Sequence, residues 1–145
     1  MKKQITFINL PSFAPEQELL AHWIKKCAIA YNGIIRIVQY NFVSEADMLN
    51  LNTSFLSHDT HTDIITFSYS ETTEIEAEVF ICTERLVENA KKNRETTDNE
   101  LLRLISHAIL HCLGYGDKTI AEKKIMRTEE DNCISMFHVK PLQDV

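Results

Sequence analysis

Two histidines and an aspartate in the last third of the chain have the spacing of a metal site. Residues 107–117 read HAILHCLGYGD. His107 and His111 are four residues apart, so on a helix both imidazoles lie on one face and can reach one ion. Gly114 lacks a Cβ and can end that helix in a left-handed turn, which brings Asp117 back toward the same ion. Three such ligands leave one coordination position open for water, as in catalytic zinc sites.

The residue after the first histidine excludes one familiar metal chemistry. Zinc peptidases with an HExxH motif carry a glutamate there as the general base. This chain has Ala108 at that position, so peptide hydrolysis by that mechanism lacks its base. The spacing alone leaves two interpretations open: a metal site, or two helical histidines without a ligand. The apolar surroundings favour the metal site, because buried imidazoles cost stability unless they bind metal or form hydrogen bonds.

The segments around this motif predict an α+β fold in which helices cover a small sheet. Residues rich in β-branched and aromatic side chains predict the strands, and apolar residues at helical spacing predict the helices. Strands are expected at 4–9, 34–42, 64–69 and 78–82. Helices are expected from Pro15 to Gly33, after Ser44, over 83–93, from Thr97 to Gly114 and from Thr119 to about Phe137. Thr97 and Thr119 are each followed three residues later by a glutamate, which is the spacing of a capping box.

Length and composition indicate one globular domain over residues 1–145. The chain has 145 residues, of which 44% are hydrophobic and 25% are charged, and both fractions are typical of globular domains. No apolar run approaches the roughly 20 residues of a membrane-spanning helix, and the N-terminal segment lacks the pattern of a signal peptide. A cytoplasmic location is therefore expected. The scattered cysteines, which form no CxxC pair, are expected to be reduced and buried; they are Cys27, Cys82, Cys112 and Cys133.

The charge balance argues against a general nucleic-acid-binding surface. The chain has 15 basic and 21 acidic residues and a net charge of −6, whereas such surfaces are usually basic. Two local basic clusters occur at residues 91–94 and 123–127, and glutamates flank both. Solvated helix faces are therefore the expected interpretation of these clusters.

Three segments of the chain resemble the YbeY family of metal-dependent endoribonucleases, which are implicated in ribosomal RNA maturation. The family motif H-G-x-L-H-L-x-G-Y-D-H compares with HAILHCLGYGD at 107–117. Upstream, L-N-x-x-[YF]-R-x-x-D-x-x-T-D-V-L-S-F compares with LNTSFLSHDTHTDIITF at 51–67, and G-D-I-x-I-x compares loosely with AEVFIC at 77–82. The resemblance implies a small mixed sheet, here of four strands, flanked by about five helices.

The same resemblance implies which residues bind the metal. His107 and His111 match two histidine ligands of the family, and Asp117 stands where the family has a third histidine. The implied cofactor is Zn²⁺, one ion per chain, and a water bound to it is the implied nucleophile. A carboxylate is an acceptable zinc ligand, and it also admits harder ions such as manganese.

Further departures from the family motif concern residues around the metal. Leu56 replaces an arginine, the natural clamp for a phosphate, and Gly116 replaces an aspartate. His58 is the candidate catalytic residue that offers a partial substitute for the arginine; the alternative is a solvated loop histidine. Asp63 matches the family loop and is expected to be structural, through a local turn or a hydrogen bond that orients a ligand histidine.

The expected function is that of a cytoplasmic, metal-dependent endoribonuclease that cuts single strands. It is expected to act in the processing of the ribosomal RNA of the small subunit. Its expected partners are single-stranded RNA, ribosomal RNA and the ribosomal subunit or its proteins, and no membrane; the RNA-binding residues are not assigned. One rival is a non-catalytic ribosome-biogenesis or RNA-binding factor with a structural metal, which Leu56 and Gly116 favour. A second rival is a hydrolase of another phosphoester.

Overall fold

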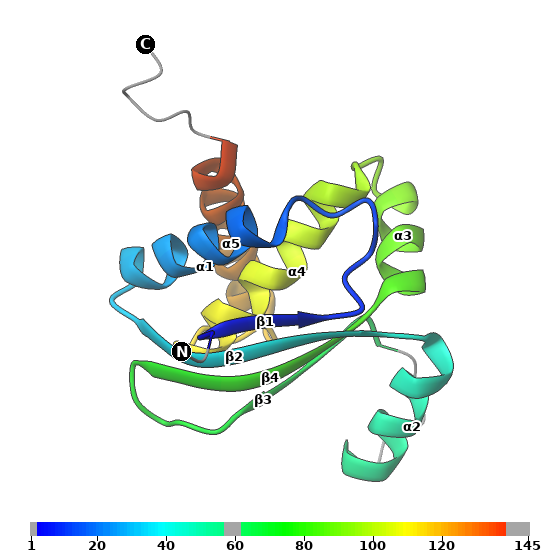
Figure 1. The fold of residues 1–145 in the computed structure, drawn as a ribbon, viewed down its shortest axis with the longest axis horizontal. Helices are drawn as coiled ribbons and strands as arrows, with labels where there is room; N and C mark the ends of the chain where they lie inside the picture. The colour runs from blue at the N-terminus through cyan, green and yellow to red at the C-terminus, as the bar shows by residue number, and fades with distance from the viewer. Residues whose placement is uncertain (1–2, 57–61, 139–145) are drawn as a thin grey trace.

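Four strands form one mixed sheet and five helices surround it, among residues 3–56 and 62–138, which this computed structural model describes (Figure 1). In chain order the elements are β1 (Ile5–Ile8), α1 (Gln17–Ala30), β2 (Ile34–Val43), α2 (Glu45–Leu56), β3 (Ile64–Ser68), β4 (Glu74–Cys82), α3 (Thr83–Lys92), α4 (Thr97–Cys112) and α5 (Ile120–His138). The predicted α+β class, the mixed four-stranded sheet and the number of helices are confirmed for this part of the chain.

The strand order β1-β2-β4-β3 combines parallel and antiparallel pairing. β1 runs parallel to β2 and β2 parallel to β4, whereas β3 pairs antiparallel with β4. Along β4 the buried residues alternate, with Ile75, Ala77, Val79 and Ile81 each at most 4% exposed. Because side chains of a strand alternate between the two faces of a sheet, this pattern identifies one strongly buried face.

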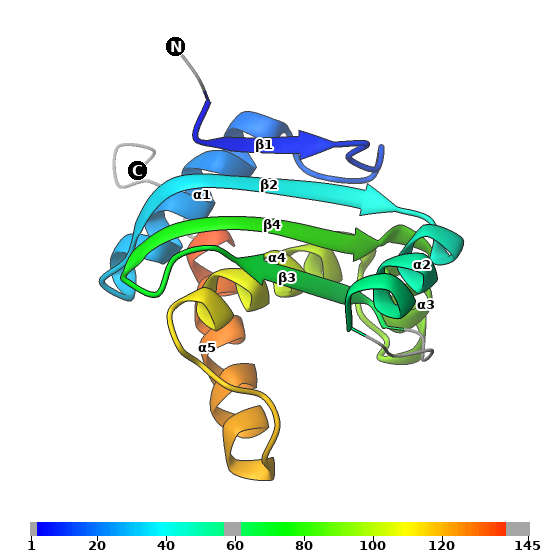
Figure 2. The same ribbon diagram turned by 90° about the horizontal axis from the view of Figure 1, so that it is seen from below.

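Helices α1, α4 and α5 cover that face (Figures 1 and 2). α4 carries fully buried residues along most of its length, and Tyr40 of β2 donates a hydrogen bond from its hydroxyl to the carbonyl of Ile105, 3.1 Å away. The Trp23 indole of α1 donates to the carbonyl of Cys133 in α5 at 2.7 Å. These buried hydrogen bonds fix the positions of α1, α4 and α5 around one core.

Helix α2 lies over the opposite face of the sheet, where β2 and β4 end (Figure 2). Its Met48 packs in a second small core with Ile65 of β3 and Cys82 of β4. The helix begins as predicted, because the Ser44 hydroxyl accepts a hydrogen bond from the backbone N–H of Asp47 at 3.1 Å.

Three predicted boundaries were wrong. β4 begins at Glu74 rather than at residue 78, because Ile75 and Ala77 already alternate inward within an acidic stretch. The N-cap of α4 is Thr96 rather than Thr97, and its hydroxyl accepts from the backbone N–H of Asn99 at 3.2 Å. Helix α1 ends at Ala30 rather than at Gly33, and the residue with positive φ after it is Asn32, at 64°.

Two composition-based predictions can also be compared with the structure. Each of the four cysteines carries a free thiol; three of these residues are buried and Cys112 is partly buried, in agreement with the prediction. Within the two described ranges, no helix has the length and apolar character that spanning a membrane requires.

Candidate active site

The predicted metal ligands line one cavity of about 520 Å³. α4 contributes His107 and His111 to the wall of this cavity, and the loop after α4 contributes Asp117. Asp63, the residue just before β3, also lines the cavity. Helix α5 closes one side with Glu130. The volume lies in the range of ligand-binding pockets, so the structure brings together residues that are far apart in the sequence.

The end of α4 has the conformation that the sequence predicted. Gly114 has a φ of 101°, which a residue with a Cβ rarely adopts. Its backbone N–H donates to the carbonyl of His111 at 3.1 Å, and that of Tyr115 donates to the carbonyl of Leu110 at 3.0 Å. The helix is therefore closed by backbone hydrogen bonds, and the chain turns directly into the loop that carries Asp117.

That loop is held by the first turn of α5. One carboxylate oxygen of Glu122 accepts hydrogen bonds from the backbone N–H groups of Lys118 and Thr119, at 3.1 and 3.0 Å. The Thr119 hydroxyl accepts in return from the N–H of Glu122 at 3.0 Å, which confirms the predicted capping box. The backbone hydrogen bonds from Thr119 and Lys118 lower the pKa of the Glu122 carboxyl.

Gly116 permits this arrangement. A Cβ at position 116 would lie 2.5 Å from a carboxylate oxygen of Glu122, closer than non-bonded atoms approach. Because two backbone donors hold that carboxylate, it cannot move away without loss of the capping box. Local sterics therefore explain why this position is a glycine here, whereas the family motif has an aspartate.

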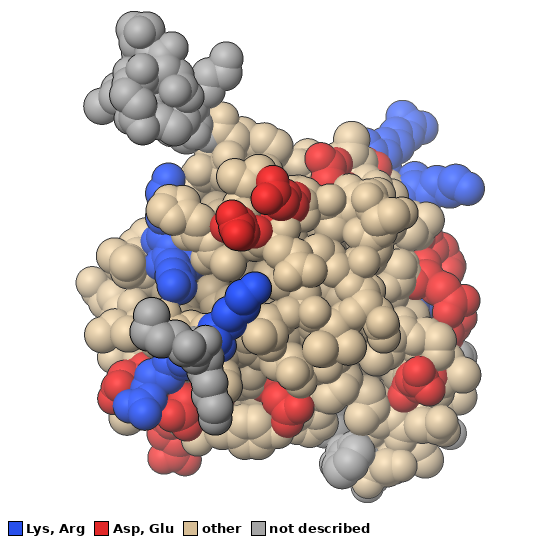
Figure 3. Space-filling model, viewed as in Figure 1, with Lys and Arg blue, Asp and Glu red and all other residues tan. Residues whose placement is uncertain are grey.

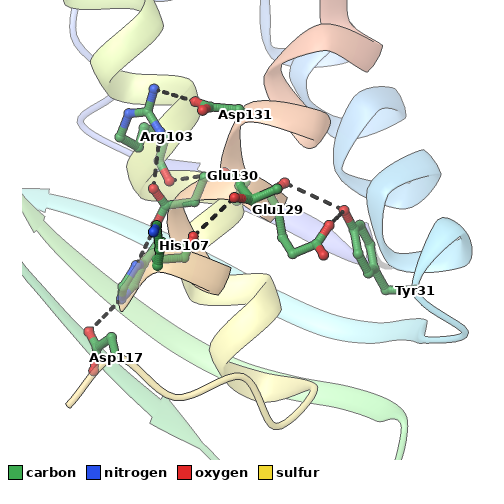
Figure 4. A network of polar contacts seen from close by, with 10 residues as sticks. Tyr31, Arg103, His107, Asp117, Glu129, Glu130 and Asp131 are labelled. Atoms are coloured by element: carbon green, nitrogen blue, oxygen red, sulfur yellow. Dashed lines mark hydrogen bonds and ion pairs between the residues drawn. The ribbon is translucent and has the colours of Figure 1, made fainter. Parts of the chain in front are cut away.

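His107 lies between two carboxylates (Figure 4). Its Nδ1 is 2.7 Å from Oε2 of Glu130, and its Nε2 is 3.3 Å from Oδ2 of Asp117. A carboxylate accepts hydrogen bonds, so the short contact with Glu130 holds a proton on Nδ1, and Nε2, which faces Asp117, is the nitrogen available to a metal. Two ligands of a tetrahedral ion with bonds of about 2.1 Å lie roughly 3.4 Å apart, which is close to the separation of Nε2 and Oδ2.

Glu130 belongs to a buried ionic network that the sequence analysis missed. Its other oxygen is 3.1 Å from Nη1 of Arg103, whose Nη2 is 2.8 Å from Oδ1 of Asp131. Glu130 is 5% exposed and Arg103 is 9% exposed. A signal was available, because Glu130 falls at helical spacing between the buried residues Met126 and Cys133. A carboxylate in a buried stripe requires a cationic or hydrogen-bonding partner.

These surroundings shift two pKa values in the cavity. Burial opposes the charged form of His107, but the hydrogen bond and charge of Glu130 outweigh it, and the pKa of His107 is raised. Burial raises the pKa of Glu100 to about 7, against the opposing charges of Arg103 and Arg127. Shifted pKa values of this kind are typical of functional clefts.

The structure supports the chemistry of the predicted ligand set without completing it. His107 and Asp117 are in contact, and His111 lines the same cavity from a more exposed position. Over 3–56 and 62–138, however, no three His, Cys, Asp or Glu side chains are arranged so that together they could hold an ion. The three-ligand site therefore stays a prediction.

Comparisons with known proteins identify the family of this chain. The family model described as Endoribonuclease YbeY matches residues 12–138. The chain belongs to the YbeY family. An Endoribonuclease YbeY from Flavobacterium johnsoniae is 35% identical over 124 residues, which cover 86% of this chain and 89% of the relative. One from Cytophaga hutchinsonii is 40% identical over 115 residues, which cover 79% and 80%.

A solved structure supports the fold of this YbeY chain. The solution structure of TM1509 from Thermotoga maritima matches with a TM-score of 0.61 at 24% identity. The match covers 92% of this chain and 88% of that protein, so the two chains share their fold.

The remaining predicted residues have different outcomes. His58 lies outside the described residues, and so does the side chain of Leu56, which ends α2. Asp63 lines the cavity, but its carboxylate accepts a hydrogen bond from the Asn89 amide at 3.1 Å. Glu130, rather than Asp63, is hydrogen-bonded to His107, the predicted ligand.

The interpretation of the basic clusters as solvated helix faces was incomplete. Lys92 and Arg127 line the 520 Å³ cavity. Lys123, Lys124 and Arg127 also line an adjoining cavity of about 540 Å³, which shares His107 and Asp117 with the first. The helical spacing of these residues gave no sign of this, because the cavity forms only when α5 packs beside α4.

Proposed function

We propose that this YbeY protein is a metal-dependent endoribonuclease that hydrolyses single-stranded RNA, with ribosomal RNA as its substrate and the ribosomal subunit as its partner. The proposal includes a single domain over residues 1–145 and action in the cytoplasm. Its main support is the position of His107. Glu130 fixes its Nδ1 at 2.7 Å, and its Nε2 faces Asp117 in a cavity that His111 also lines.

The donor set fits a divalent ion. His107, His111 and Asp117 would hold it, and two imidazoles with one carboxylate are typical ligands of catalytic zinc. The proposed cofactor is one Zn²⁺ per chain, although the carboxylate also suits other divalent ions. When bound, such an ion polarises a phosphate oxygen and activates water.

The side chains of this chain prepare the site in two ways. Glu130 keeps the proton on Nδ1 of His107, so that Nε2 remains a ligand, and such partners of metal-binding histidines strengthen metal affinity. Arg103 balances the charge of Glu130 at 3.1 Å. The network therefore keeps a proton on Nδ1 of His107, so that Nε2 is the nitrogen presented to a metal.

Local cations offer a route for the RNA backbone. Lys92 and Arg127 line the main cavity, and Lys123 and Lys124 line the adjoining one. On the face that Figure 3 shows, Lys and Arg side chains gather at two edges of the molecule among Asp and Glu side chains, so the proposed basic path is the one along the two cavities. RNA phosphates are attracted to such a basic path, even though the net charge of the protein is −6.

A cleavage assay with matched histidine variants tests the proposal. The purified protein should cut a labelled single-stranded RNA, and activity should disappear with chelator and with His111→Ala. His22→Ala is the control, because His22 is exposed on α1 and lines a different cavity. Cleavage that survives chelator or His111→Ala would contradict a metal mechanism.

The alternative function is a non-catalytic RNA-binding factor whose metal is structural. Leu56 favours it, because leucine cannot replace the arginine of the family motif as a phosphate clamp. Lys92 and Arg127 weaken this argument by placing other cations in the cavity, and Gly116 has its own steric reason. Full metal occupancy without metal-dependent cleavage would identify the alternative.

A further inference from the structure

Glu100 is a buried carboxylate that lines the same cavity from the first turn of α4. It is 5% exposed. No hydrogen bond or ion pair to its carboxylate is found within residues 3–56 and 62–138. No side-chain oxygen or nitrogen in these ranges is both sealed from solvent and unpaired, so the carboxylate oxygens reach the space of the cavity. Glu100 is thus a built-in acceptor without a protein partner.

Such a group needs an explanation, because a carboxylate that is largely withdrawn from solvent and has no protein partner destabilises a protein. The other buried acidic residue in this cavity, Glu130, is paired with both Arg103 and His107. Arg103 and Arg127 lie close enough to oppose the shift of the Glu100 pKa, whereas Asp63 and Glu130 add to it. The position retains an acidic group that is available to a ligand.

Glu100 stands two helical turns before His107, the nearer candidate ligand on α4. It precedes His107 by seven residues, about 10 Å along a helix that rises 1.5 Å per residue. A proton-transfer group must lie within hydrogen-bond reach of its target. That separation suits contact with a neighbouring nucleotide of a bound strand instead.

We propose that Glu100 holds the Watson–Crick edge of a guanine in the nucleotide next to the cleaved phosphate, an inference that rests on the proposed function. An ionised carboxylate offers two adjacent acceptors. Guanine presents two adjacent donors, N1–H and the N2 amino group, whereas adenine, cytosine and uracil each place an acceptor beside their donor. Proteins read unpaired RNA bases by hydrogen bonds to this edge.

The surrounding side chains suit a nucleotide. Asn89 and Thr62 add polar groups to the lining of the same cavity, and Lys92 and Arg127 supply cations for the flanking phosphates. A volume of about 520 Å³ accommodates a base together with part of its backbone. Glu100 is therefore a specificity residue, separate from the candidate metal ligands.

Binding of three matched probes tests this subsite without reference to catalysis. The probes are 2′-O-methyl oligouridines with one central guanine, inosine or adenine, and their affinities for the metal-loaded protein are measured by fluorescence anisotropy at pH 8. Inosine keeps N1–H but lacks the N2 amino group. The wild type should bind the guanine probe at least about fivefold more tightly than the other two.

Two variants assign this preference to the carboxylate. Glu100→Gln should reduce the preference for guanine to less than about twofold, whereas Glu88→Gln should keep it. Glu88 is exposed on α3 and lies outside the residues that line the cavity, so its variant removes the same charge elsewhere. The inosine comparison in the wild type remains informative even if Glu100→Gln folds poorly.

The outcomes separate the subsite from the proposed function. RNA cleavage together with equal affinity for all three probes would overturn the guanine subsite and leave the endoribonuclease intact. A guanine preference that persists in Glu100→Gln would also overturn it. Absence of both RNA binding and RNA cleavage would overturn the two proposals together.

Discussion

Glu100 and Glu130 are buried to the same extent and line the same cavity, yet their surroundings differ completely. Each is 5% exposed. Glu130 of α5 contacts Arg103 at 3.1 Å and His107 at 2.7 Å. For the Glu100 carboxylate, by contrast, the described part of the chain supplies no hydrogen-bond partner, and burial raises its pKa to about 7.

The difference shows that two buried carboxylates of one site have different roles. A paired carboxylate is fixed and positions another group, here the imidazole of His107. An unpaired carboxylate lowers the stability of the folded protein and is available to an incoming ligand. The Glu130 carboxylate is therefore stabilised by contacts within the protein, whereas the Glu100 carboxylate is expected to gain its partner from the substrate.

The largest effect is expected from removing the charge of Glu130. Glu130→Gln leaves Arg103 without its buried partner, so the free energy of unfolding should fall by about 3 kcal/mol. Metal affinity should fall by roughly 10- to 100-fold, since His107 loses the group that orients it. Urea denaturation and metal titration measure the two effects.

Asp131→Asn is the matched control for Glu130→Gln. It removes the other partner of Arg103. The side chain of Asp131 is 57% exposed, so the free energy of unfolding should fall by less than about 1 kcal/mol. Equal losses in the two variants would show that burial does not distinguish the two ion pairs.

Removing the charge of Glu100 should raise the free energy of unfolding, whereas removing that of Glu130 should lower it. The pKa of Glu100 is about 7 in the folded protein against an ordinary value of 4.5, so the folded state binds its proton more tightly. Stability from this group is present below pH 4.5 and is lost as the pH rises through 7. Glu100→Gln should therefore gain stability relative to the wild type between pH 5 and pH 8, by roughly 3 kcal/mol at pH 8.

The measurement is urea denaturation of both proteins across that pH range. Glu88→Gln provides the baseline for removal of an exposed charge. A stability difference between Glu100→Gln and the wild type that does not change with pH would contradict an unpaired, shifted carboxylate.

Gly114→Ala should have a smaller effect, confined to the Glu130 end of the cavity. A Cβ at a φ of 101° is strained and should cost about 1 kcal/mol of stability. Because Gly114 sets the path of the loop to Asp117, metal affinity should also fall. The affinity for the guanine probe should not change, and a parallel loss there would show that the two ends are not independent.

Local patterns predicted the parts of this site that lie close together in the sequence. The helical spacing of His107 and His111, the left-handed turn at Gly114 and the capping box at Thr119 depend on neighbouring residues alone. The pairing of His107 with Glu130 spans 23 positions and depends on how α4 packs against α5. The sequence therefore predicted the candidate metal ligands but missed Glu130, Arg103 and Glu100.

For the fold, the sequence predicted the elements but not all of their boundaries. The type and order of the elements followed from periodicity, because buried residues recur at the spacing of each element. The start of β4 was misplaced because Ile75 and Ala77 alternate with glutamates, which masked the strand. The cap of α4 was assigned to the second of two adjacent threonines, and only the observed contact of Thr96 with Asn99 decides between them.

Metal content tests the central claim most directly. Elemental analysis after dialysis should find about one zinc ion per chain in the wild type and in Asp98→Asn, and much less in Asp117→Asn. Asp98 lies in the first turn of α4 and apart from the residues that line the described cavity, so it controls for the loss of one carboxylate on the same part of the chain. Zinc retained at the wild-type level in Asp117→Asn would contradict the ligand set His107, His111 and Asp117.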